Sequence, residues 1–269
     1  MDDDVNNSDD VMRSKFVIFT DLDGTLLDED YSFDVAKPTI ERLKELGIPI
    51  IFCSAKTKAE QEVFRSMMGV YDPFIVEDGS AIYVPKNYFK KMCGEPKNGY
   101  EVVVLGVRYE EIVEEIKKLR EKFRVESYYF MSVEEVAKVT GLSKEMAKLA
   151  KMREFSETVV FAEERAVEEL KRKFNVVVGG KFIHVYGKNA DKGKAVKILT
   201  ELYEELYGNV TTIGIGNSYT DKPMLKAVDV PALVKNPDCW ANINIKNLYK
   251  AKGVATEGWV EVVEKFVFG

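Results

Sequence analysis

Two carboxylates stand two residues apart directly after an apolar run of the sequence. Asp21 and Asp23 follow residues 16–19, and alternate residues of extended backbone point to the same side. Both can therefore face one pocket, where Asp21 can attack phosphorus while Asp23 protonates the leaving alkoxide and later activates water. Gly24 permits a tight turn, and the Thr25 hydroxyl can orient Asp23. The segment predicts phosphoryl transfer, and the alternative is an Asp-rich turn that caps a helix.

Residues 21–25 resemble the first motif, DxDGT, of the haloacid dehalogenase-like phosphohydrolases. The other motifs of that family are then expected at the ends of later strands. Ser54 follows an apolar run and matches the second motif, whose hydroxyl binds the transferring phosphoryl group; alone, it would also suit a helix N-cap. Lys192 matches the third motif, a lysine at a helix start that neutralises charge on the nucleophile and the phosphoryl oxygens. Lys188 is the fallback candidate. The resemblance thus implies that Asp21, Asp23, Ser54 and Lys192 are catalytic.

The fourth motif of the family is expected after the apolar residues 211–213. Family members commonly carry GDxxND there, whereas this chain reads GNSYTD, with Asn217 at the first acidic position and Asp221 at the last. The resemblance implies a magnesium ion held by Asp21, the backbone carbonyl of Asp23, the Asn217 side chain and waters, with Asp221 as a ligand or beside one. An amide oxygen carries no formal charge, so we expect weaker magnesium binding unless Asp221 coordinates the ion directly.

The outer parts of the sequence alternate short apolar runs with helical patterns. This alternation predicts an α/β core with a doubly wound, Rossmann-like parallel sheet. The expected strands are 16–19, 48–53, 74–76, 210–215 and 232–234, and the expected helices are 35–46, 192–207 and 222–227. Such a sheet binds ligands at the carboxyl ends of its strands, which is where the motif residues lie. We assign 15–89 and 188–269 to this core domain, and 1–14 to a disordered acidic tail.

In residues 90–187 the expected strands and helices follow each other in a different order from the core, which predicts an inserted α+β cap domain. The expected strands are 101–107, 127–130, 158–162, 176–178 and 182–186, the last two joined by Gly179-Gly180, and the expected helices are 110–123, 133–138, 143–152 and 163–174. A phosphate pocket at an open sheet edge cannot choose a leaving group by itself. We therefore expect the cap to close over the site and to supply specificity.

Two cap segments, 153–158 (REFSET) and 179–184 (GGKFIH), resemble the mannosyl-3-phosphoglycerate phosphatases, as do 54–57 and 77–82. This resemblance implies magnesium-dependent hydrolysis of mannosyl-3-phosphoglycerate to mannosylglycerate through an aspartyl-phosphate. Cap residues would grip the sugar hydroxyls and the glycerate carboxylate. The alternative is that these polar residues do not bind substrate and lie at a solvated helix end or strand start. The implied substrate-binding residues are Thr25, Ala55, Lys56, Arg153, Glu154, Ser156, Glu157, Thr158, Lys181, His184 and Lys188.

Composition argues against several other kinds of partner. The formal net charge of -6 disfavours nucleic acid and anionic membranes. The three cysteines lack the spacing of a zinc site or a disulfide framework, and no apolar run approaches the ~18 residues of a membrane span. We expect a cytoplasmic enzyme whose partner is a small phosphorylated sugar-glycerate. The sequence does not indicate an oligomeric state.

Other functions fit the same residues. A broad sugar-phosphate phosphatase or a phosphomutase of the same superfamily would use the same core motifs. Asn217 and Thr220 could instead mark a catalytically weakened module that only binds a phosphorylated sugar. Mannosyl and glucosyl substrates differ in the orientation of one hydroxyl, which a few cap contacts could distinguish.

Overall fold

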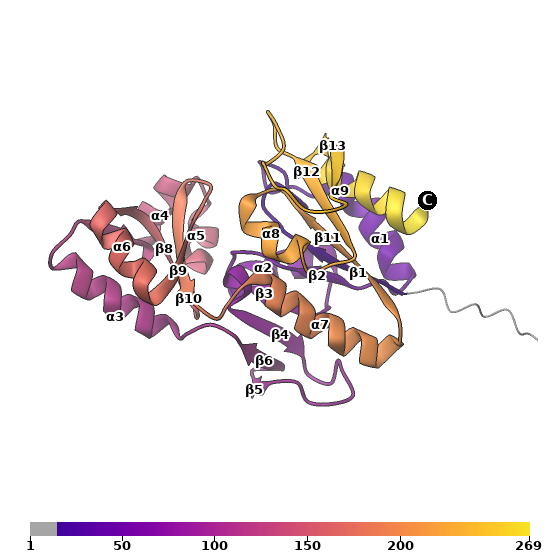
Figure 1. The fold of residues 1–269 in the computed structure, drawn as a ribbon, viewed down its shortest axis with the longest axis horizontal. Coiled ribbons are helices and arrows are strands. Elements are labelled where there is room, and N and C mark those ends of the chain that lie inside the picture. The colour runs from indigo at the N-terminus through magenta and orange to yellow at the C-terminus, as the bar shows by residue number, and fades with distance from the viewer. Residues whose placement is uncertain (1–14) are drawn as a thin grey trace, which may run out of the picture.

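The structure is a computed structural model that describes residues 15–269, and it contains three sheets (Figure 1). The tail predicted for residues 1–14 lies outside the described residues. The largest sheet has five parallel strands in the order β13-β12-β11-β1-β2, which confirms the predicted α/β core. Its strands are β1 (Lys15–Thr20), β2 (Ile50–Phe52), β11 (Val210–Gly216), β12 (Val230–Lys235) and β13 (Tyr249–Val254).

Helices cover both faces of this parallel sheet, which explains why β1 and β2 read as apolar runs. Successive residues of β1 pack on opposite faces of the sheet: Ile18 lies in one core cluster with Trp259, and Val17 lies in another with Leu199. The helices of the first cluster are α1 (Lys37–Glu45), α2 (Lys58–Met68) and α9 (Ala255–Val263), and those of the second are α7 (Lys192–Tyr207) and α8 (Lys222–Leu225).

A second sheet, antiparallel and in the order β3-β4-β6-β5, extends the core beyond β2. An isolated bridge between Cys53 and Ile75 joins it to the end of β2. The strand predicted at 101–107 within the cap is β6, and it pairs with β4 beside the core, because Val102 packs into the core cluster. We therefore propose that the cap begins near Gly106. The strands are β3 (Phe74–Val76), β4 (Ala81–Pro85), β5 (Glu95–Lys97) and β6 (Tyr100–Val104).

The third sheet, in the order β7-β8-β10-β9, forms the cap with its helices (Figure 1). Neighbouring residues of β8 face opposite clusters, since Val159 packs with α3 and α6 whereas Val160 packs with α4 and α5. The strand predicted at 127–130 is mostly wrong: only Ser127 lies in a strand, β7, and residues 128–130 form a 3-10 turn. The cap elements are α3 (Tyr109–Arg120), β7 (Val125–Ser127), α4 (Val133–Thr140), α5 (Lys144–Ala150), β8 (Ser156–Ala162), α6 (Glu164–Lys173), β9 (Phe174–Gly179) and β10 (Phe182–Gly187).

Short helical turns complete the chain. Within residues 15–269, no helix combines the length and the apolar character that crossing a membrane requires. The turns are η1 (Asp34–Ala36), η2 (Glu77–Gly79), η3 (Tyr128–Phe130), η4 (Tyr219–Asp221) and the C-terminal η5 (Glu264–Phe268).

The turn η2 between β3 and β4 has an uncommon backbone. Glu77, Asp78 and Gly79 all have positive φ, at 50°, 59° and 87°. A Cβ on Gly79 would lie 2.2 Å from the carbonyl carbon of Asp191 and 2.4 Å from the amide nitrogen of Lys192. Glycine at this position therefore lets the turn pack against the first residue of α7.

We expect Gly79→Ala to lower the free energy of unfolding by roughly 2–5 kcal/mol, because it adds a backbone clash to the strain of a positive φ. Gly99→Ala is a matched control, since Gly99 has φ +82° and nothing within 4 Å of its Cβ position. The control should lose only about 1 kcal/mol. Urea titration followed by circular dichroism measures both, and equal losses would contradict the close packing of η2 on α7.

Candidate active site

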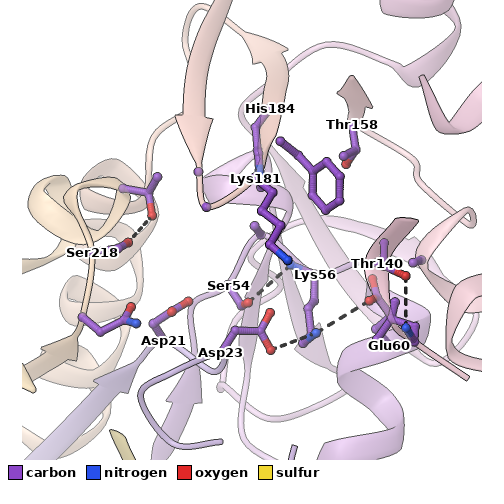
Figure 2. A pocket seen from close by; sticks show the side chains of 18 of the residues that line it. Asp21, Asp23, Ser54, Lys56, Glu60, Thr140, Thr158, Lys181, His184 and Ser218 are labelled. Carbon is purple, nitrogen blue, oxygen red and sulfur yellow. Dashed lines mark hydrogen bonds and ion pairs between the residues drawn. The ribbon is translucent and has the colours of Figure 1, made fainter. Parts of the chain in front are cut away.

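A cavity of about 440 Å³ lies between the carboxyl ends of the core strands and the cap. Figure 2 shows Asp21 and Ser54 on the core side and His184 on a cap strand across from them. The structure thus brings many of the predicted residues together. Those that line the cavity are Asp21, Asp23, Ser54, Ala55, Lys56, Arg153, Thr158, Lys181, His184, Lys192 and Asn217.

The end of β1 presents the two carboxylates of the first motif in different environments. The Asp21 amide donates to the carbonyl of Ile215 at 2.9 Å, which ties the segment to β11. Asp21 is buried, whereas the Asp23 side chain is 51% exposed. Gly24 has φ +68°, and a Cβ there would lie 2.4 Å from Asn217 Nδ2. The glycine therefore allows the first and fourth motifs to approach closely.

Lys192 begins α7 and lies between two buried carboxylates. Its Nζ is 3.1 Å from Asp21 Oδ1 and 2.7 Å from Asp221 Oδ1. Burial alone would lower the pKa of Lys192, but the two carboxylates outweigh this effect and raise it well above its ordinary value. Lys192 is therefore a fixed cation at the point where a phosphoryl group would meet Asp21.

The protein groups around Asp21 disfavour the ionised form of its carboxyl. Burial is the main cause that raises its pKa to about 7, the Asp221 charge adds to it, and Lys192 opposes both. A nucleophilic carboxylate must be anionic to attack phosphorus. A further positive charge beside Asp21 would therefore favour the ionised carboxylate that the attack requires.

Asp221 and Asn217 have separate tasks in the loop after β11. Asp221 Oδ2 accepts from the amides of Asn217 and Ser218 at 3.0 Å each, while Oδ1 binds Lys192. Both oxygens of Asp221 are therefore engaged, and the residue does not line the cavity. Asn217 does line it, with its Nδ2 donating to Asn236 at 3.0 Å. The amide oxygen is then the Asn217 atom suited to coordinate a cation.

The atoms around Asp21 suit a hard divalent cation. Among residues 15–269 there is no group of three or more His, Cys, Asp or Glu side chains placed to hold a metal. The Asp21 carboxylate, the Asp23 carbonyl and the Asn217 amide oxygen are nevertheless all oxygen donors, the type that Mg²⁺ prefers, and waters commonly complete its shell. A cation bound beside Asp21 would also lower the pKa of its carboxyl, which burial and, to a smaller extent, the Asp221 charge raise.

Lys56 contacts the predicted acid–base residue as well as the cavity. Its buried Nζ lies 3.0 Å from Asp23 Oδ1 and 3.8 Å from Glu60 Oε1. These carboxylates overcome the effect of burial and raise the pKa of Lys56. Figure 2 shows Lys56 between them. Lys56 therefore holds the Asp23 side chain at the cavity wall in addition to the substrate-binding role that the sequence predicts.

Arg153 and Glu77 join the cap to the core beside the cavity. Glu77 accepts from the Glu154 amide at 2.9 Å, the Phe155 amide at 3.1 Å and the Ser156 hydroxyl at 2.6 Å. Arg153 pairs with Glu77 at 3.7 Å and donates through Nη2 to the Ala55 carbonyl at 2.9 Å. Residues 77–82 belonged to the sequence resemblance, but their residue types did not indicate that Glu77 is the residue that binds the cap segment 153–156.

Six predicted residues lie outside the cavity wall. Ser156 and Asp221 are engaged as described above, and Glu154 accepts from the Tyr83 hydroxyl at 2.7 Å. Glu157 is buried and accepts from the Tyr129 amide at 2.9 Å, and Thr25 is buried. The exposed Lys188 donates to the Lys171 carbonyl at 2.8 Å, so Lys192 rather than Lys188 is the lysine near Asp21. Direct binding by the other residues stays a prediction.

The rest of the cavity wall consists of residues to which the sequence analysis assigned no catalytic, substrate-binding or metal-binding role. These residues come from the loop after the first motif, from the first turn of α2, from the cap and from the loops after β11 and β12. The glycine pair that joins β9 and β10 belongs to the 179–184 segment of the sequence resemblance, but no site role was predicted for it. The additional residues are Tyr31, Glu60, Tyr128, Thr140, Leu142, Ala150, Gly179, Gly180, Phe182, Ser218, Thr220 and Asn236.

The chain is similar to known hydrolases, and its curated relatives are phosphatases. The family model of the haloacid dehalogenase-like hydrolases matches residues 18–242. A glucosyl-3-phosphoglycerate/mannosyl-3-phosphoglycerate phosphatase of Persephonella marina is 41% identical over 257 residues, covering 92% of this chain and 95% of the relative. A mannosyl-3-phosphoglycerate phosphatase of Pyrococcus horikoshii is 43% identical over 221 residues, covering 81% and 90%.

Solved structures share the fold at low sequence identity. Protein 0175 of Thermoplasma acidophilum superposes with a TM-score of 0.68 at 18% identity, covering 94% of this chain and 99% of that one. A haloacid dehalogenase-like hydrolase of Bacteroides thetaiotaomicron gives 0.66 at 16% identity, with 94% and 99% covered. The arrangement of core and cap is therefore common to these proteins.

We expect Lys192→Met to lower the free energy of unfolding by about 3–5 kcal/mol, because it leaves Asp21 and Asp221 buried without their cation. Lys188→Met makes the same change at an exposed lysine and should alter stability by less than about 0.5 kcal/mol. Chemical denaturation at pH 7 measures both variants. Equal stability of the two variants would contradict the buried role of Lys192.

Proposed function

Since the chain belongs to the haloacid dehalogenase-like hydrolase family, we propose that it hydrolyses the phosphate monoester of mannosyl-3-phosphoglycerate or of its glucosyl counterpart. The observation that carries the proposal is the meeting of Asp21, Asp23, Ser54 and Lys192 in one capped cavity. The relatives at 41–43% identity, which are glycosyl-3-phosphoglycerate phosphatases, suggest the substrate class. The organic product would be the dephosphorylated glycosylglycerate.

In the first step, Asp21 would attack the phosphorus atom in line with the ester oxygen. A bond forms between an Asp21 carboxylate oxygen and phosphorus, the bond from phosphorus to the ester oxygen breaks, and Asp23 gives that oxygen its proton. The Ser54 hydroxyl and the Lys192 ammonium would bind the phosphoryl oxygens, because both line the cavity beside Asp21.

In the second step, water would release phosphate from Asp21. Asp23 is now ionised, so it can take a proton from the attacking water while the water oxygen bonds to phosphorus and the bond from the Asp21 oxygen to phosphorus breaks. Lys56, 3.0 Å from Asp23 Oδ1, would keep the carboxylate at the cavity wall during this exchange. The two steps together return both aspartates to their starting protonation states.

We propose that Asp21, the Asp23 carbonyl and Asn217 hold Mg²⁺, and that Asp221 supports them from behind. When bound, the ion would offset the repulsion between the Asp21 carboxylate and the phosphoryl oxygens. Asp221 keeps the supporting role because its two oxygens bind Lys192 and the loop amides. The neutral Asn217 predicts a modest affinity for the ion.

The cap wall provides groups that suit a glycosylated phosphoglycerate. Arg153 and Lys181 line the cavity and are cations that can bind the glycerate carboxylate, while Thr158 and His184 can hydrogen-bond sugar hydroxyls. A single lysine grips a carboxylate less specifically than a bidentate arginine does. We therefore propose that substrate selection comes mostly from the set of cap contacts.

We expect phosphate release from mannosyl-3-phosphoglycerate and glucosyl-3-phosphoglycerate to exceed that from mannose 6-phosphate, and to need Mg²⁺. Asp21→Asn should lower kcat by roughly 10⁴-fold or more, since the nucleophile is lost. The control Asp229→Asn changes a carboxylate that binds Thr212 outside the cavity wall, and it should keep activity. Colorimetric phosphate assays measure all of these. Preference for mannose 6-phosphate would contradict the substrate, and an isomeric phosphate seen by NMR would indicate a mutase.

We expect Asn217→Asp to lower the Mg²⁺ concentration needed for half-maximal activity by about tenfold, because it adds a charged oxygen ligand. Asn98→Asp introduces the same charge at an exposed residue and should not change that concentration. Magnesium titrations of phosphate release, supported by calorimetric Mg²⁺ binding, give the comparison. Unchanged binding in both variants would place Asn217 outside the metal shell.

A further inference from the structure

The turn η2 brings a carboxylate of the core against a residue of the cap. Asp78, 4% exposed, is the second residue after β3, and its amide donates to the Ser54 carbonyl at 3.2 Å. Its Oδ2 lies 2.8 Å from Nδ1 of His184, which belongs to β10. Asp78 takes no part in the proposed chemical steps. Its contact with the cap therefore calls for another explanation.

His184 lies on the face of the cap sheet that meets the cavity. Thr158 is its register partner on β8, and Phe182 precedes it by two residues on β10, so all three side chains share one face. All three also line the cavity. Figure 2 shows His184 across the cavity from Asp21 and Ser54. This is where the organic part of a phosphate ester held by Asp21 would lie.

Asp78 determines which nitrogen of His184 a ligand can meet. Burial would raise the pKa of Asp78, but its hydrogen bond with His184 and the positive charge of Lys192 outweigh burial and hold that pKa below its ordinary value. An ionised carboxylate only accepts hydrogen bonds, so His184 Nδ1 must carry the proton that it shares with Asp78. In the neutral ring, Nε2 is then an acceptor, and it is the nitrogen left for a ligand.

We propose that Asp78 is a positioning residue for substrate recognition: it fixes His184 so that Nε2 accepts a hydrogen bond from a hydroxyl of the substrate's leaving group. The ligand class is a polyhydroxylated leaving group such as a glycosylglycerate, so the inference rests on the proposed function. Thr158, beside His184, can hydrogen-bond the same group.

The placement of the pair across the two domains links recognition to closure of the cap. Asp78 is held on the core by the packing of η2 against the first residue of α7, whereas His184 belongs to β10 of the cap sheet. The contact can exist only when the cap lies over the cavity, as it does in this structure. A substrate hydroxyl that binds Nε2 therefore favours the closed arrangement.

Asp78→Asn tests the inference because asparagine tolerates the φ of +59° at this position and keeps the side chain's size. The amide can donate as well as accept, so it no longer enforces one His184 tautomer. For the preferred glycosyl phosphoglycerate, we expect KM to rise roughly tenfold with a smaller change in kcat, as for the loss of one hydrogen bond. For p-nitrophenyl phosphate, which has no hydroxyl to recognise, both constants should change much less.

A double variant separates positioning from a purely structural role. If Asp78 acts through His184, Asp78→Asn should add no further rise in KM once His184→Ala has been made. The proposal would be overturned if the increases in KM caused by the two single substitutions multiplied in the double variant. It would also be overturned if Asp78→Asn impaired the turnover of both substrates equally. Asp229→Asn serves as the control for removing a carboxylate from the core.

Two further results keep the test decisive. If Asp78→Asn fails to fold, judged by circular dichroism, His184→Ala alone must still show the KM effect that depends on hydroxyl groups, or the inference fails. If the wild type prefers another sugar phosphate, the proposed substrate is wrong. The comparison of that sugar phosphate with p-nitrophenyl phosphate then still decides the role of Asp78.

Discussion

The buried carboxylate of Glu77 determines how the cap is seated on the core. Removing a carboxylate from water costs several kcal/mol unless hydrogen bonds replace the lost hydration. Burial raises the pKa of Glu77 even though Arg153, the Ser156 hydroxyl and two backbone amides lower it. These donors all come from residues 153–156, which lead into β8 and include its first residue. Protein groups therefore replace the hydration of the Glu77 carboxylate only when residues 153–156 lie where the structure has them. The shape of the cavity depends on this contact between Glu77 and the cap.

The same turn carries this constraint into the catalytic site. Next to Glu77, Asp78 meets His184 of the cap, and the backbone of Gly79 packs against Lys192. The carbonyl of Ser80 then accepts from the amides of the segment 105–106, which leads into the cap, at 2.9 Å each. One short turn thus contacts the segment entering the cap, the cap sheet and the start of α7. Its left-handed backbone allows successive residues to point to these different partners.

The parts of the fold that follow from local pattern could be predicted from the sequence. Apolar runs located β1, β2, β11 and β12, and the family motifs located Asp21, Ser54 and Lys192 at their ends or at a helix start. Contacts between distant segments could not be read in this way. The pairing of β6 with β4 rather than with the cap sheet, and the capture of residues 154–156 by Glu77, depend on tertiary packing. Likewise, a lysine's sequence context does not reveal that Lys188 faces away from Asp21.

The charge balance around Asp21 gives a physical reason for asparagine at position 217. Asp21 and Asp221 are two buried anions with one shared cation, Lys192, and the pKa of Asp21 is already raised to about 7, chiefly by burial. An aspartate at 217 would place a third carboxylate within reach of Asp21 and raise that pKa further in the absence of a metal. The amide retains an oxygen donor without this repulsion. The metal-free site is then easier to maintain in the folded protein, and the corresponding cost is a weaker hold on a divalent ion.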